Sequence, residues 1–208
     1  AATFGQNWAN LSNQGTEFYQ KGEYTQAIEL FQKASKQAEK EFGNEHENYA
    51  ITLNNLASLH QKLEQYVEAE KLFIELMEVE KKRVGENAPD YGFALNNLAG
   101  LYYTINKFNK ADSLFSEALV IDENFYGKGS PKYAKSLHNL GILYEKKGKY
   151  QKAKSFFIQS LTIKKAHFGT NKWSELNEMA LFANKQSDYR AALKFWKQAL
   201  RQADQEFG

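Results

Sequence analysis

The sequence of 208 residues contains no cysteine, only two prolines and no long apolar run. The absence of cysteine excludes disulfide bonds, thiolate catalysis and cysteine-based zinc sites. It leaves the compartment open, since a chain without thiols suits either redox environment. No stretch of 18 consecutive apolar residues is present, so no segment is expected to insert into a membrane.

The net charge is also low: the sequence contains 27 lysines and arginines and 25 aspartates and glutamates, which gives a formal charge of +2. A nucleic acid or an acidic membrane requires clustered lysine and arginine side chains. The charge therefore predicts a partner that is not a nucleic acid. The scarcity of proline, together with abundant Ala, Leu, Glu, Lys and Gln, favours an all-helical chain. Hydrophobic residues, at 42%, suffice for a buried core.

One feature is abundant, a repeat with a step of 42 residues. Four positions recur at this step, and each keeps one kind of side chain. They are occupied by Tyr24, Tyr66, Phe108 and Tyr150; by Ala27, Ala69, Ala111 and Ala153; by Phe31, Phe73, Phe115 and Phe157; and by Gly43, Gly85, Gly127 and Gly169. A fifth unit follows at a step of 39 residues, since three residues are missing at the start of its first helix.

Each unit contains two segments with apolar residues at helical spacing. Leu95, Leu98 and Tyr102 fall at positions i, i+3 and i+7, which form one face of an α-helix. A second stripe begins at Ala111, and a short polar turn separates the two. Each unit is therefore predicted to be a helix, a tight turn, a second helix and a loop. One array is expected over residues 1–208, with repeats at about 6–43, 44–85, 86–127, 128–169 and 170–208.

Two stretches of one unit resemble the tetratricopeptide repeat. Its signature of Leu-Gly, two residues and Tyr, followed by Ala, three residues and Phe, is matched at 140–144 and 153–157. Leu-Asn-Asn-Leu-Ala at 53–57 and again at 95–99 resembles the 42-residue subtype of kinesin light chains and many bacterial proteins. The resemblance implies an all-α fold, a right-handed α-solenoid of five helical hairpins with ten antiparallel helices, and it points to a bacterial source.

In arrays of this family the hairpins stack into a superhelix, and the first helix of each unit lines the concave face. The resemblance thus implies a binding groove. A column of asparagines repeats on the expected first helices: Asn13, Asn55, Asn97 and Asn139. An asparagine offers a donor and an acceptor, the pair that a peptide backbone presents, and related peptide-binding arrays use asparagine in this place. The alternative is that these side chains bond to neighbouring helices and fix the stacking of the repeats. The sequence leaves both interpretations open.

Other polar and aromatic side chains are expected on the same face: Asn54, Asn96, His138, Tyr19 and Tyr103. Lysines are expected at its rim: Lys62, Lys135, Lys146 and Lys185. This mildly basic edge would suit a partner segment with some acidic residues. Family members that grip a terminal carboxylate place lysine on successive first helices. Such a clamp is not expected in the first three repeats, because Ser12 and Phe93 stand where lysine would be needed.

Catalysis is not predicted. The four histidines are scattered, and no pair has a metal-binding spacing such as His-Glu-x-x-His. His60 takes the position that Tyr102 holds in the next unit, so it is expected in the core. The segment Gly127-Lys128-Gly129-Ser130 follows a helix and not a strand, which excludes a phosphate-binding loop. We therefore expect no catalytic residue, no metal site and no cofactor.

The predicted function is a scaffold that binds a protein or peptide segment in its groove. Two alternatives remain open: a regulatory or sensor segment of a larger protein, for example upstream of a peptidase or signalling effector, and a passive spacer. The last expected helix, with Leu193, Trp196 and Leu200, has no polar capping helix after it. It is expected to expose apolar surface, which points to a longer protein or to self-association through the C-terminal repeat. Ala1–Gln6 resembles either the end of an export signal or that of a preceding repeat, so an exported and a cytoplasmic location both remain open.

Overall fold

The computed structural model describes residues 6–168, 176–177, 180–181, 183–184 and 187–207, which are helices joined by short turns and contain no strand. The all-α prediction is confirmed for these residues. The chain divides into two compact units, residues 1–106 and 107–208. This boundary falls in a turn inside the expected third repeat. Much of the expected first helix of the fifth repeat lies outside the described residues, and so does Lys185.

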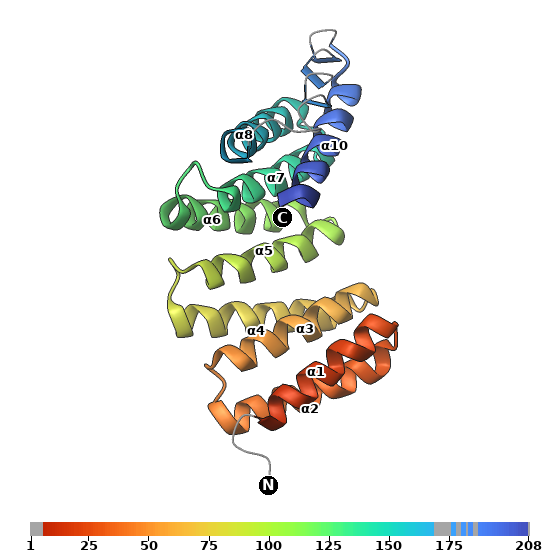
Figure 1. Ribbon diagram of the computed structural model, residues 1–208, viewed down its shortest axis with the longest axis vertical. Helices are drawn as coiled ribbons and strands as arrows, with labels where there is room; N and C mark the ends of the chain where they lie inside the picture. Colours follow the sequence, from red (N-terminus) through yellow and green to blue (C-terminus); the bar gives the residue numbers. More distant parts are fainter. Residues whose placement is uncertain (1–5, 169–175, 178–179, 182, 185–186, 208) are drawn as a thin grey trace. The chain divides into compact units, whose positions relative to one another are not determined.

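The first unit consists of five helices that alternate between 16 and 19 residues in length (Figure 1). They are α1 (Gln6–Lys21), α2 (Tyr24–Phe42), α3 (Glu47–Lys62), α4 (Tyr66–Val84) and α5 (Pro89–Thr104). Helix α1 packs on α2 and α3 packs on α4, while α2 also contacts α3 and α4 contacts α5. The core lies between these layers, where Leu53, Leu59 and Phe73 are almost completely buried.

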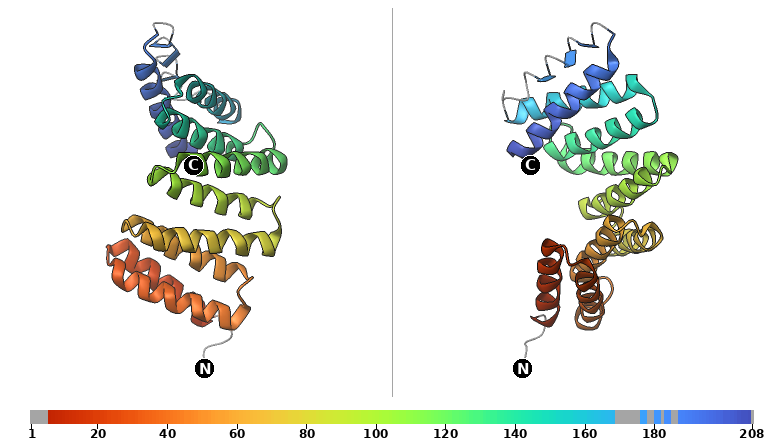
Figure 2. Two further views of the ribbon diagram at one scale, coloured as in Figure 1. Left: turned by 180° about the vertical axis from the view of Figure 1, so that it is seen from behind. Right: turned by 90° about the vertical axis from the view of Figure 1, so that its right-hand side faces the viewer.

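The second unit consists of α6 (Phe108–Tyr126), α7 (Pro131–Lys146), α8 (Tyr150–Phe168) and α10 (Tyr189–Phe207), together with the short described pieces before α10. Helix α7 pairs with α8, and α10 packs on α8, as two orientations show (Figure 2). Phe157 and Leu161 of α8 meet Trp196 and Leu200 of α10 in one buried cluster.

The sequence-based expectation of an exposed apolar last helix is wrong. Leu193, Trp196 and Leu200 are between 0% and 3% exposed. They are buried because α10 packs on α8 and on Ala180, in one of the short described pieces before it. Exposed apolar surface on these three residues therefore no longer supports self-association through this end.

Turn geometry follows the repeat. The second helices α2, α4 and α6 end at Gly43, Gly85 and Gly127, whose φ angles are +90°, +85° and +79°. Such positive φ values favour glycine because a Cβ atom would be strained there. The turns between the two helices of a hairpin also contain a residue with positive φ. This residue is a glycine at Gly148, whereas Glu64 takes a positive φ without being glycine. Glycine therefore stands at most of these turns because the backbone there has a positive φ.

Close helix contact makes one glycine sensitive to substitution. A Cβ atom added at Gly141 in α7 would lie 2.6 Å from Cδ1 of Phe157, whose ring is fully buried. The steric cost of about 1–3 kcal/mol exceeds the gain in helix propensity of about 1 kcal/mol. We expect Gly141→Ala to lower the free energy of unfolding by about 1 kcal/mol in urea titrations. Gly100→Ala in α5 is the matched control, since its added Cβ would meet nothing within 4 Å. The control should be stabilised by about 0.5–1 kcal/mol, and equal gains in both variants would contradict this packing.

Candidate functional site

Two asparagines meet on the first helices of the first unit. Nδ2 of Asn97 in α5 donates to Oδ1 of Asn54 in α3 at 2.8 Å, and both side chains are half-buried. This bond joins neighbouring helices, as the stacking interpretation of the asparagines requires. It uses one N–H of Asn97 and the oxygen of Asn54, so the Asn54 amino group and the Asn97 oxygen still offer the donor and the acceptor that pair with a peptide backbone.

Exposed apolar side chains stand one helical turn before these amides. Ile51 precedes Asn54 by three residues and is 39% exposed, while Phe93 precedes Asn97 by four residues and is 55% exposed. Side chains three or four residues apart share one face of a helix. We call Ile51, Asn54, Phe93 and Asn97 the amide–apolar face. Sequence reasoning missed its apolar half, although Ile51 and Phe93 are 42 residues apart and therefore hold the same repeat position.

An open cavity of about 190 Å³ lies against this face. Ile51, Asn54 and Phe93 line it together with a charged group on α4 and α5. In that group Arg83 bonds Glu80 at 2.9 Å and Asp90 at 2.6 Å. Burial raises the pKa of Glu80, against the opposing effect of Arg83. The cavity can accept an apolar side chain, and its charged edge carries more carboxylates than cations.

The other predicted site residues of the first unit have varied surroundings. Asn13 is exposed on α1, and Asn55 is half-buried on α3. Asn96 is half-buried and donates to the backbone oxygen of Gly92 at 3.1 Å, within its own helix. Tyr103 is half-buried and takes part in a further interaction. None of these four belongs to the amide–apolar face as defined above.

Lys62 is engaged within the chain. Its Nζ lies 5.4 Å from the ring centres of both Tyr19 and Tyr24. The two rings are 5.8 Å apart, so they form an aromatic pair beneath the ammonium group. Cation–π contacts of this kind hold a lysine near the rings. This contact limits the role of Lys62 as a free basic group at a groove rim.

His60 differs from its expected core position. It is only partly buried, and its Nδ1 lies 2.5 Å from Oε1 of Gln65. Tyr102, at the same repeat position, is 5% exposed and donates its hydroxyl to Glu70 at 2.9 Å. The smaller, more polar ring of His60 thus bonds at the surface, whereas the tyrosine reaches across to a second helix.

His138 in the second unit is enclosed. Its ring lies against Phe157 with ring centres 5.8 Å apart, and its Nδ1 is 3.9 Å from Oδ2 of Asp204 in α10. Burial is the main reason why its pKa is lowered to about 4, and Asp204 opposes the shift. His138 therefore remains neutral near pH 7. Asn139, the next residue, is half-buried and has an interaction partner.

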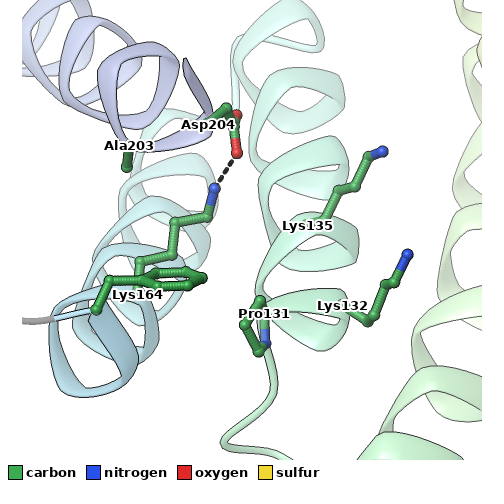
Figure 3. Close-up of a pocket in the computed structure, with 7 residues that line it drawn as sticks. Pro131, Lys132, Lys135, Lys164, Ala203 and Asp204 are labelled. Carbon is green, nitrogen blue, oxygen red and sulfur yellow. Dashed lines mark hydrogen bonds and ion pairs between the residues drawn. The ribbon is translucent and has the colours of Figure 1, made fainter. Parts of the chain in front are cut away.

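Lysines surround a larger cavity of about 440 Å³ near the start of α7. Lys164 is almost completely buried there and pairs with Asp204 (Figure 3). Lys132 and Lys135 extend from α7 away from that pair in the same view. Both of these lysines are exposed, as is Lys146 at the end of α7. Lys135 and Lys146 thus lie at different places along α7, and the cation that pairs with Asp204 is Lys164.

Within the described part of the chain, no group of three or more His, Asp or Glu side chains could hold a metal ion. No described helix is long and apolar enough to cross a membrane.

Comparisons with known proteins agree with this architecture. A tetratricopeptide repeat family profile matches residues 9–79, 50–124 and 108–166. No curated protein matches the sequence. Among solved structures, the chain is similar to BtubC (BKLC) from P. vanneervenii, with 18% identity, a TM-score of 0.73 and coverage of 100% of this chain and 94% of that chain. It is also similar to a putative kinesin light chain from Podosopora anserina with nearly identical TPR-like repeats, with 19% identity, a TM-score of 0.72 and coverage of 96% and 97%.

A further similar structure is the Rap conjugation gene regulator of the plasmid pLS20 in complex with the Phr* peptide. Identity is 16%, the TM-score is 0.66, and the match covers 96% of this chain and 54% of that chain. At such identities the likeness shows the fold alone. Because the family profile spans most of the sequence, the chain belongs to the tetratricopeptide repeat family, and the all-α solenoid fold predicted from its sequence is confirmed.

Proposed function

We propose that this chain is a scaffold for an extended protein or peptide segment, and that the amide–apolar face holds this segment in the first unit. The observation that carries the proposal is the pair Asn54–Asn97 beside the exposed side chains of Ile51 and Phe93. The amides supply hydrogen bonds to a main chain, and the apolar residues supply a contact for one side chain. The Rap regulator, a structural relative, is in complex with a peptide, which supports the same class of ligand here.

Physical magnitudes favour an apolar anchor on this face. Burying an exposed phenylalanine contributes about 1.5–3 kcal/mol, whereas a hydrogen bond that replaces water contributes about 0.5–1.5 kcal/mol. Phe93 should therefore dominate affinity, and the two amides should set the register of the main chain. The carboxylates at the cavity edge disfavour acidic residues next to the anchor.

The test is a selection of ten-residue peptides from a displayed random library against the full chain, followed by fluorescence anisotropy. We expect selected peptides to share an apolar residue and to bind Phe93→Ala about 10–100-fold more weakly. The double variant Asn54→Ala with Asn97→Ala should lose about 10-fold, and it removes both partners so that no amide is left unpaired.

Phe125→Ala is the matched control, because Phe125 is 62% exposed on α6 of the other unit. It should bind selected peptides as the unaltered chain does. Selected peptides that bind Phe93→Ala with unchanged affinity would show that this face is not the site. A library that yields no binder would favour the passive spacer.

A further inference from the structure

The near-neutral total charge conceals a strong division between the two units. Residues 107–208 contain 18 lysines and arginines and 10 aspartates and glutamates, a formal charge of +8. Residues 1–106 contain 9 and 15, a formal charge of −6. A difference in charge between the two halves of a chain indicates charged partners better than the net charge does. Sequence reasoning used only the sum and so missed the basic character of the second unit.

Part of this positive charge forms a row on one helix. Arg190, Lys194, Lys197 and Arg201 follow one another in α10 at intervals of four, three and four residues. This spacing places them on one face, over roughly 16 Å at 1.5 Å per residue. We call these four residues the α10 cation row. They line an open cavity of about 350 Å³ together with Gln198 and Glu145.

The α10 cation row is poorly neutralised by the chain itself. Lys197 pairs with Glu145 of α7 at 3.1 Å. Arg190, Lys194 and Arg201 are exposed and make no ion pair with a described residue. Like charges three or four residues apart destabilise a helix, so the row does not stabilise α10 by itself. A ligand of opposite charge would relieve this repulsion.

The row also faces the first helix of its hairpin neighbour. Lys197 and Arg201 both act on His138 of α7, where they lower the pKa of its ring. The Lys197–Glu145 pair reaches the same helix. The cavity therefore lies along α10 and is bordered by Glu145 of α7.

We propose that the α10 cation row docks an acidic, extended segment of a partner protein. Side chains on one side of an extended segment recur about every 6.6 Å, twice the rise of 3.3 Å per residue. Over roughly 16 Å this gives two or three acidic side chains at alternate positions, which matches the three unpaired cations. A single-stranded nucleic acid fits less well, because it prefers aromatic rings for base stacking and none lines this cavity among the described residues. This surface is separate from the amide–apolar face and does not depend on it.

The experiment measures binding of a labelled ten-residue peptide of alternating Glu and Ser to the full chain by fluorescence anisotropy. Reversal of the row with Arg190→Glu, Lys194→Glu and Arg201→Glu should weaken binding about 30-fold, since each surface charge pair contributes a few-fold. The control carries the same change of charge at exposed lysines outside the row: Lys128→Glu, Lys152→Glu and Lys165→Glu. It should lose no more than about 3-fold. Circular dichroism checks that both variants keep their helicity. If charge reversal unfolds α10, peptide binding is measured instead with the neutral variant Arg190→Gln, Lys194→Gln and Arg201→Gln.

Three outcomes would overturn the proposal. Equal losses in the row variant and the control would mean that only the overall charge of the unit matters. Tighter binding of a single-stranded oligonucleotide of the same charge, with the same dependence on the row, would assign the surface to nucleic acid. A doubling of mass by light scattering at low salt, abolished by row reversal, would assign it to the acidic unit of a second copy. The Phe93→Ala variant should bind the acidic peptide normally, which keeps this result distinct from the test of the amide–apolar face.

Discussion

Trp196→Ala is expected to lower the free energy of unfolding of the second unit by about 3–5 kcal/mol. The indole is fully buried among Phe157, Leu161 and Leu200, and its Nε1 donates to Oδ1 of Asn177 at 3.1 Å. The substitution leaves a large cavity and removes that hydrogen bond. Because α10 contacts α8 through this cluster, its docking should weaken along with the core.

Hydrogen exchange read by mass spectrometry localises the effect. Amides in α8 and α10 should exchange faster in Trp196→Ala, while those in α2 and α3 should not, since repeat arrays transmit stability mainly between neighbours. Tyr189→Ala is the control on the same helix, at a side chain that is 38% exposed. It should cost less than about 1 kcal/mol. Equally fast exchange in α2 would indicate that the two units unfold together.

Acidification from about pH 6.5 to about pH 4 is expected to remove up to about 3 kcal/mol of stability from the second unit. The pKa of His138 is lowered from 6.5 to about 4, chiefly by burial. Asp204 opposes this shift, while Lys164, Lys197 and Arg201 add to it. Within this window the unfolded chain binds a proton at His138 that the folded chain does not. Stability is therefore full above pH 6.5 and is lost as the pH falls through the window.

Urea titrations between pH 4 and pH 8 measure this loss. His138→Leu removes the titrating ring, so its stability should vary less over the same range. His167→Gln is the matched control, because it removes a histidine from an exposed position of α8 in the same unit. The first unit offers a contrast, because burial raises the pKa of Glu80 and protonation of that group favours the folded state. An unchanged pH profile in His138→Leu would contradict the enclosed position of the ring.

The helices were predictable because their signals are local and repeated. Aromatic residues at the start of each second helix, glycines after its end and apolar stripes every three or four residues all recur at one step. Each of these signals fixes a helix boundary or a buried face without knowledge of distant contacts. The division of the chain into five repeats remains a prediction of the sequence.

Contacts between helices were less predictable, because they depend on rotation and offset. The asparagines that meet are Asn54 and Asn97, which are 43 residues apart, and not two members of the 42-residue column. A shift of one residue turns a side chain by about 100° around a helix with 3.6 residues per turn. The sequence pattern shows which residues repeat, but it does not show which neighbours in adjacent helices come into contact.

The burial of α10 shows a second limit of prediction from the sequence. The apolar stripe of α10 was visible in the sequence, but the pattern did not show that this stripe packs against Phe157 and Leu161 of α8. The same applies to Lys164, whose buried ammonium pairs with Asp204 of α10. From the sequence alone, a lysine such as Lys164 is interpreted as an exposed charge, and only the structure shows the aspartate beside it.

The two units carry opposite formal charges, so each unit has a strong net charge although the whole chain is nearly neutral. The net charge of +2 predicts weak adsorption to any charged support. Local fields, however, decide adsorption at distances near the Debye length of about 8 Å at physiological ionic strength. One molecule can therefore present its acidic unit to an anion exchanger and its basic unit to a cation exchanger in the same buffer, and its retention on either resin reports the charge of one unit and not that of the chain.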